Sequence, residues 1–205
     1  SGKADHAHVA SVLSRFSMML YLAEAMGNAE ASKGLATSRL AAIVFDRDEA
    51  VDDVMRAFID TLRDGGFKVA GLVQEPGAEE RDLQVRDLTT GERLPIMQDL
   101  GADSSGCAVD PAAIAVAARM IDRARGEKPD LLVVNRFGRL ESEGAGMIAE
   151  IGAAVAEGEA VLIAVPLRYR DAWNAFADGL DAQIPAERGG LERWWSALAR
   201  ENASA

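Results

Sequence analysis

The sequence predicts an α/β protein in which helices cover both faces of a mostly parallel β-sheet. Three short, mostly apolar runs, at residues 40–45, 130–135 and 160–166, are typical of strands that are buried on both faces. Segments with the apolar spacing of amphipathic helices separate these runs. The first strand, a helix and a second strand follow one another within about 35 residues, and such a unit places its two strands parallel through a right-handed crossover.

The first 39 residues are expected to form an extension outside the α/β domain. Residues 9–25 place apolar side chains on one helical face, which predicts an extra N-terminal helix that ends near Gly27. These side chains are Val9, Val12, Leu13, Phe16, Met19, Leu20 and Ala23. Residues 29–38 are small and polar, as is typical of a linker. We therefore divide the chain into an extension (1–39) and an α/β domain (40–205).

The remaining elements follow in order along the domain. They are a helix at 49–64, a strand at 67–74, a helix at 110–125, a strand at 130–135, a helix near 147–157, a strand at 160–166, and closing helices at 173–180 and 191–199. Gly65 supplies a stop for the helix at 49–64, and Asp110 supplies an N-cap for the helix at 110–125. Residues 83–96 alternate between polar and apolar, which predicts a small β-hairpin beside the sheet. Trp194 and Trp195 are adjacent in the last helix, and we expect them to cover the core. The alternative is that one of them is exposed for contact, because adjacent side chains of a helix cannot face one way.

The composition excludes several classes of protein. The chain has 205 residues, of which 49% are apolar and 27% charged, as expected for one globular domain with an extension. A formal net charge of -11 disfavours nucleic acid as a partner. No apolar run reaches the roughly 20 residues that a membrane-spanning helix needs. A single cysteine and the lack of a signal-peptide pattern predict a cytoplasmic location.

The loops at the carboxyl ends of the strands hold the candidate site residues, because ligands of parallel sheets bind there. A protein that hydrolyses nucleotides needs a glycine-rich phosphate loop with a lysine and a hydroxyl after the first strand. Residues 46–53 read DRDEAVDD and contain none of these, and their carboxylates would repel a triphosphate. We interpret these acids as capping the following helix and complementing its positive end. The alternative is a cation site built from Asp46, Asp48 and Asp52.

The loop after the strand at residues 130–135 carries two arginines. Hydrolases of this topology end that strand with an acid that holds magnesium, followed by an acid that activates water. Asn135 and Arg136 stand at those places, which argues against hydrolysis. Arg136 and Arg139 suit the binding of an anion. The alternative is that they only pair with Glu141 and Glu143 at the surface.

A third candidate is the loop before the long central helix. Ser104 and Ser105 lie between glycines ahead of a helix N-terminus, where amides and hydroxyls can hold a small oxyanion. The alternative is a loop that only caps the helix. Cys107 has no nearby base, because His6 and His8 lie in the extension, so we expect a buried thiol and neither a zinc site nor a nucleophile.

Several motifs occur in the order found in a known family. They are AAIVFD, VAGLVQ, LTTGERLPIMQDLG, GCAVDP, LLVVNRFGRLESEG, AVPLRY and WW. Over roughly residues 40–200 the chain resembles an uncharacterised bacterial family whose genes often lie beside molybdate-transport genes. That family is similar to small P-loop nucleoside triphosphatases with a second motif DEIGKMEL, in which Gly138 and Glu141 match while Asn135 and Arg136 replace the two acids. The resemblance implies a three-layer, P-loop NTPase-like (Rossmann-like) fold with degenerate Walker motifs and a link to molybdenum metabolism.

Our main hypothesis is a non-hydrolysing ligand-binding or regulatory protein that holds a small anion, or a nucleotide without magnesium. Its candidate contacts are Asp46, Arg47, Gln98, Ser104, Ser105, Asn135, Arg136, Arg139 and Arg168. No catalytic residue, metal ligand or cofactor is assigned. One alternative is an atypical enzyme acting on a nucleotide or cofactor precursor, with Asp46, Asp99, Glu141 or Tyr169 as its base. The other is an interaction module that forms a homodimer through residues 9–25.

Overall fold

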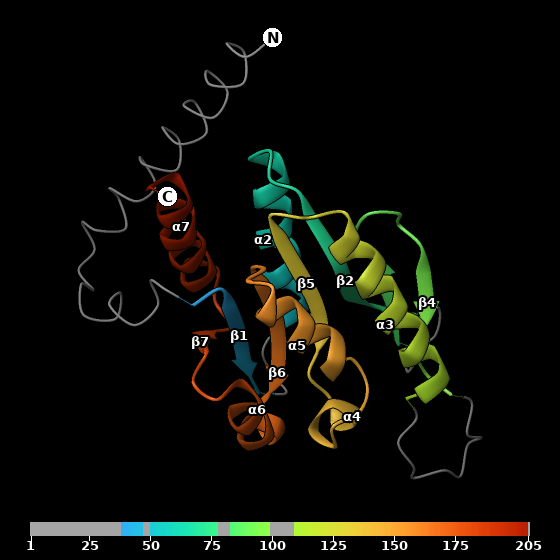
Figure 1. Cartoon of the computed structure of the whole chain (residues 1–205). Coiled ribbons are helices and arrows are strands. Elements are labelled where there is room, and N and C mark those ends of the chain that lie inside the picture. The colour runs from blue at the N-terminus through green and yellow to red at the C-terminus, as the bar shows by residue number, and fades with distance from the viewer. Residues whose placement is uncertain (1–37, 47–49, 78–82, 99–108, 205) are drawn as a thin grey trace.

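A seven-stranded sheet forms the centre of the computed structural model (Figure 1). The structure describes residues 38–46, 50–77, 83–98 and 109–204. The strands lie in the order β4-β3-β2-β5-β6-β1-β7. They are β1 (Leu40–Phe45), β2 (Val69–Pro76), β3 (Leu83–Asp87), β4 (Arg93–Pro95), β5 (Leu131–Arg136), β6 (Val161–Pro166) and β7 (Asp181–Pro185). The helices are α2 (Val51–Asp64), α3 (Pro111–Gly126), α4 (Arg139–Ser142), α5 (Ile148–Ala156), the 3₁₀ helix η1 (Leu167–Tyr169), α6 (Arg170–Ala177) and α7 (Arg188–Ser204).

Helices cover both faces of the sheet and make a three-layer molecule (Figure 1). The core on one face contains α2 and α7, and the core on the other contains α3, α5 and α6. Strand β6 contributes to both, because Ile163 lies in the α3 core and Leu162 in the α2 core, each fully buried. Strands β1, β2, β5, β6 and β7 are parallel, and β3 is antiparallel to β2 and β4. The predicted three-layer α/β class with an inserted hairpin is confirmed.

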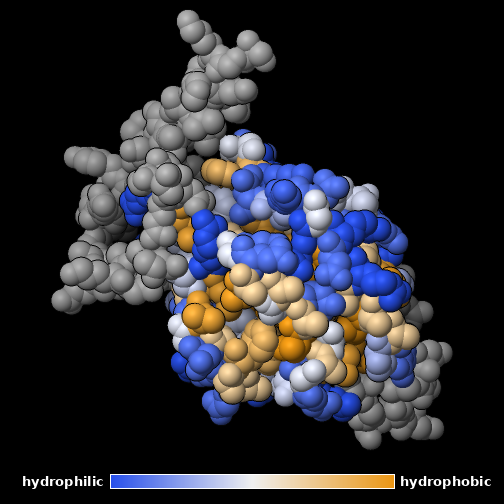
Figure 2. Space-filling view, in the orientation of Figure 1, coloured by the Kyte–Doolittle hydropathy of each residue, from blue (hydrophilic) through white to orange (hydrophobic). Residues whose placement is uncertain are grey.

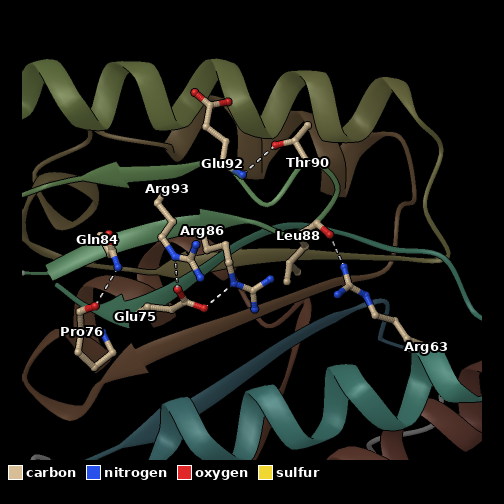
Figure 3. A network of polar contacts seen from close by, with 9 residues as sticks. All are labelled: Arg63, Glu75, Pro76, Gln84, Arg86, Leu88, Thr90, Glu92 and Arg93. Carbon is tan, nitrogen blue, oxygen red and sulfur yellow. Dashed lines mark hydrogen bonds and ion pairs between the residues drawn. The ribbon is translucent and has the colours of Figure 1, made fainter. Parts of the chain in front are cut away.

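Charged side chains tie the β3–β4 hairpin to the sheet (Figure 3). Glu75 of β2 accepts hydrogen bonds from Nε of Arg86 on β3 and, at 3.1 Å, from Nε of Arg93 on β4. Burial raises the pKa of Glu75, but the two guanidinium groups more than offset this and hold the pKa below its ordinary value. Arg63, near the end of α2, donates to the carbonyl of Leu88 just after β3. One carboxylate thus joins three neighbouring strands.

Asp87 organises the turn between β3 and β4. Its Oδ1 accepts the amides of Thr89 at 2.7 Å and Thr90 at 2.9 Å, and its Oδ2 accepts Nη2 of Arg123 from α3 at 2.7 Å. The residue is 1% exposed. Burial raises the pKa of Asp87, but the Thr90 amide, Arg123 and the Thr89 amide together lower it below the ordinary value. A buried carboxylate is stable here because every acceptor oxygen has a donor.

Strand β7 was not predicted from the sequence. The predicted helix at 173–180 is instead α6, which ends at Ala177, and the next residues pair with β1 in parallel. Only Ala182 and Ile184 of β7 are buried, and Pro185 closes the strand. Two buried positions in a five-residue edge strand give too short an alternation to recognise without its neighbour.

The prediction that the adjacent tryptophans cover the core is confirmed, and the alternative that one of them is exposed is not. Trp194 is fully buried, and its Nε1 donates to the carbonyl of Ser38 at 2.9 Å. Trp195 is 5% exposed and meets Phe67 edge-on, with ring centroids 5.2 Å apart. One ring reaches the chain before β1 and the other the turn between α2 and β2. The two rings therefore face different parts of one core.

The predicted N-terminal helix and all of the predicted linker except Ser38 fall within residues 1–37, outside the described residues. The domain boundary at residue 39 therefore stays a prediction. Among the helices that the structure describes, none is both long enough and apolar enough to cross a membrane.

Candidate functional site

The carboxyl end of β1 is the switch point of the sheet. The chain leaves β1 through α2 to reach β2, and it reaches β7 from β6 through α6, on the opposite face. Ligands of open α/β sheets bind where such connections diverge. Phe45 and Pro166 pair at the ends of β1 and β6, and Arg136 pairs with Ala164 at the end of β5. These three neighbouring strand ends form the candidate site, at the end of the sheet near α4 and α6 in Figure 1.

A β-bulge at the end of β5 turns Arg136 toward α2. Val134 pairs with Ile163 and Arg136 with Ala164, so one extra residue lies between them. Val134 belongs to the α3 core, and strict alternation would send Arg136 to that same face. Its guanidinium instead lies over the ring of Phe45 in the α2 core, 4.9 Å from the ring centroid. The bulge therefore decides which face of the sheet the arginine serves.

Arg136 forms an ion pair with Asp52 in the first turn of α2. Its Nη2 lies 2.8 Å from Oδ1 and 2.7 Å from Oδ2 of the carboxylate. The side chains are 25% and 35% exposed. Nε of Arg136 is buried and has no hydrogen-bond partner among the described residues. An unsatisfied buried donor costs about 1–3 kcal/mol, so the Nε side of the guanidinium has capacity for another acceptor.

The acids after β1 were expected to cap α2 and to complement its dipole, and the structure agrees with the second role only. Asp52 and Asp53 lie in its first turn, where negative charge complements the helix dipole, but Ala50 stands at the N-cap and makes no side-chain cap. The alternative cation site needed Asp46, Asp48 and Asp52. Asp48 lies outside the described residues, Asp52 is paired with Arg136, and the described part of the chain has no cluster of three metal-ligating side chains.

The loop after β5 is organised by Glu141. This residue is 6% exposed, and its carboxylate accepts the amides of Gly138 at 2.9 Å and Met147 at 3.1 Å. Gly146 has φ +63° and lies so close that an added Cβ would be 2.1 Å from Glu141 Oε1. Both carboxylate oxygens thus hold the backbone. This arrangement gives Glu141 a structural role in the loop.

Arg139 lies at the surface, where its Nε is 3.4 Å from Glu143 Oε1. This agrees with the simple surface pairing considered from the sequence. The corresponding prediction for Arg136 was wrong, because its partner is Asp52 and not Glu141. The sequence did not reveal this pair, because the bulge that turns Arg136 has no signal in the residue pattern.

The other predicted contacts are spread along the edge or lie outside it. Asp46 follows β1 and is exposed, and Arg168 of η1 follows β6, with its guanidinium 4.9 Å from the Tyr169 ring centroid. Gln98 follows β4, five strand intervals from β1, or about 24 Å at the usual strand spacing. The side chain of Asn135 is not described. Arg47, Ser104 and Ser105 lie outside the described residues.

The fold is shared with two solved structures. The crystal structure of THEP1 from Aquifex aeolicus aligns with a TM-score of 0.54 and 12% identity, covering 73% of this chain and 90% of THEP1. The solution structure of a human cancer-related nucleoside triphosphatase aligns with a TM-score of 0.58 and 14% identity, covering 82% of this chain and 100% of that protein. At this identity the likeness concerns the fold alone, which is P-loop NTPase-like.

The sequence is also similar to part of a curated protein. The chain is 32% identical over 162 residues to "Molybdenum import ATP-binding protein ModC 2" of Bradyrhizobium diazoefficiens. The match covers 77% of this chain but 18% of that protein, so the chain corresponds to a small part of it. Residues 40–194 match the family described as "Protein of unknown function (DUF2478)", in agreement with the resemblance seen in the motifs. The chain therefore belongs to the DUF2478 family.

Proposed function

We propose that this chain is a non-hydrolysing ligand-binding domain that holds a small oxyanion at Arg136 and acts in molybdate handling. The observation that supports it is the position of Arg136 beside the N-terminal turn of α2, with a buried Nε that no described residue satisfies. A guanidinium and a helix N-terminus both favour negative charge. Asp52 holds the arginine in place while no ligand is bound.

Asp52 sets how strongly an anion binds in this proposal. Its carboxylate neutralises Arg136 and contacts only Nη2, so the buried Nε lacks an acceptor, which a ligand oxygen would supply on entering the site. A bound oxyanion lies near the negative charge of Asp52, and the repulsion between the two charges weakens its binding. Removing that charge while keeping the shape of the side chain therefore strengthens binding.

The chain lacks, after β1 and at the end of β5, the side chains that nucleotide hydrolysis requires. Residues 46–53 offer no lysine to hold a phosphate and no hydroxyl to bind magnesium. The end of β5 carries Asn135 and Arg136 in place of two acids, and a guanidinium cannot serve as a general base at neutral pH.

We place the domain in the cytoplasm, where a protein with one cysteine needs no disulfide.

Molybdate is the preferred candidate ligand because of the similarity to the molybdenum import protein. The name of that protein describes ATP binding in molybdenum import, and a segment of it is 32% identical to this chain. We infer that the domain senses or holds the oxyanion while a separate ATP-binding protein supplies the energy. Tungstate has the same charge and shape and should bind at the same place.

The test is isothermal titration of the full chain with molybdate, tungstate, sulfate and ATP, with and without magnesium. We expect molybdate and tungstate to bind, Asp52→Asn to bind them at least tenfold more tightly, and Arg136→Lys at least tenfold more weakly. Arg119→Lys is the matched control, because it makes the same substitution at an exposed arginine of α3, on the opposite face of the sheet from α2. Absence of oxyanion binding in both the parent and the folded Asp52→Asn variant would overturn the proposal, as would sustained phosphate release from ATP.

A further inference from the structure

The outward side of α5 is an apolar surface with no described partner. Ala149 and Ala156 are exposed on it, and Gly152 and Ala153 between them are partly exposed. Glu150 is the only charged residue of the helix, and its Oε2 is buried. Figure 2 shows apolar side chains gathered over the face that α5 and α6 cover.

The outward sides of the other described helices are different. Asp53 and Asp60 are exposed on α2, Arg119 on α3, Asp171 on α6 and Arg193 on α7. Each of these helices therefore presents charge to water, as the surface helix of a free domain normally does. α5 is the exception, and an apolar helix surface of this kind is typical of a contact.

The chain itself contains a segment that needs such a surface. Residues 9–25 carry seven apolar side chains at helical spacing, and a helix with such a stripe is stable mainly when the stripe is buried. Because alanine and glycine have the smallest side chains, they let a second helix approach α5 closely. We propose that residues 9–25 fold back as a helix onto the outward side of α5.

The place where the chain joins the domain suits this arrangement. Ser38 Oγ hydrogen-bonds the carbonyl of Leu180, in the turn after α6. Leu180, at this junction, is an apolar side chain that is 61% exposed. The twelve residues 26–37 span up to about 40 Å when extended, which exceeds the distance across a few strands. A 17-residue helix is about 25 Å long, against about 13 Å for α5, so it can also cover α6 and Leu180.

Gly152 offers a clean way to test the contact. A Cβ added there would meet nothing within 4 Å, so Gly152→Glu puts a charge on the outward side of α5 without disturbing the described core. Gly126, at the end of α3, is the matched control, because a Cβ there also meets nothing within 4 Å. Neither substitution touches the site at Arg136, so the outcome is independent of the proposed oxyanion binding.

The experiment is hydrogen–deuterium exchange of the full chain at two protein concentrations, with the mass in solution measured in parallel. We expect amides in residues 9–25 to exchange at least tenfold more slowly than a free peptide at both concentrations. Gly152→Glu should remove that protection and Gly126→Glu should keep it, while the amides of β1 and β6 stay protected in both. The proposal is overturned if residues 9–25 are unprotected in the parent or stay protected in Gly152→Glu. Protection that appears only together with a dimer mass assigns the surface to a second copy and also overturns it.

Discussion

Nη2 of Arg136 lies 2.7 Å from Oδ2 of Asp52, and this contact joins the end of β5 to the first turn of α2 across 84 residues of sequence. The pair is partly shielded from water, so its two charges interact more strongly than an exposed pair does. It lies at the strand ends where proteins of this fold place ligands, so the same pair contributes to the stability of the domain and to its candidate site.

We expect this pair to show measurable coupling in a double-mutant cycle. Arg136→Met should lower the free energy of unfolding by about 1–2 kcal/mol, because it leaves Asp52 partly buried and unpaired. The coupling between Arg136→Met and Asp52→Asn should be about 1 kcal/mol in urea unfolding. The exposed pair of Arg139 and Glu143 is the control, with an expected coupling of about 0.2–0.5 kcal/mol. Equal coupling in the two cycles would show that the shielding has no effect.

Gly146 should be intolerant of a side chain because of Glu141. Gly146→Ala places a Cβ 2.1 Å from Glu141 Oε1 and also forces alanine to φ +63°. We expect a loss of about 2–4 kcal/mol, from strain at positive φ and from the clash. Gly158→Ala has a similar φ of +70° but nothing within 4 Å, so its cost should be about 1 kcal/mol. Similar losses for the two variants, measured by chemical denaturation, would remove Glu141 from the explanation.

Asp87 should make the domain sensitive to acid. Its pKa is lower in the folded protein than the ordinary 3.8, so it contributes stability that is present above pH 3.8 and is lost as the pH falls through the folded value. The midpoint of urea unfolding should therefore decrease as the pH falls below about 4. Asp87→Asn should be less stable at pH 7 and should show a smaller decrease over the same range. An unchanged pH dependence in this variant would contradict the assignment.

Two buried tryptophans differ in the partner of their indole nitrogen. Nε1 of Trp173 donates to Asp181 Oδ2 at 2.7 Å, whereas Nε1 of Trp195 has no partner among the described residues. Both Trp173→Phe and Trp195→Phe lose similar apolar volume, but only the first leaves an acceptor without its donor. We expect Trp173→Phe to cost about 1–2 kcal/mol more in the free energy of unfolding. Equal costs in thermal and urea unfolding would indicate that packing alone decides the effect.

The sequence alone was sufficient to predict the layers of this fold. Continuous apolar runs such as residues 161–166 can only be buried on both faces, because each of their side chains avoids water. The glycine, lysine and hydroxyl of a phosphate loop are absent from residues 46–53, and this too is readable directly. Both features depend on which residues are present and on their spacing, which are local properties.

The tertiary structure decided the direction of individual side chains. The bulge beside Arg136 reverses the face that alternation assigns to it, and the partner that it then meets, Asp52, comes from a distant segment. Strand β7 exists because β1 offers it a free edge, although Asp181–Pro185 has only two buried positions of its own. Hydrogen bonding between strands and packing between layers set these features, and both act between residues far apart in the chain. Local spacing in the sequence therefore determines the class of fold, whereas long-range contacts determine the geometry of the site.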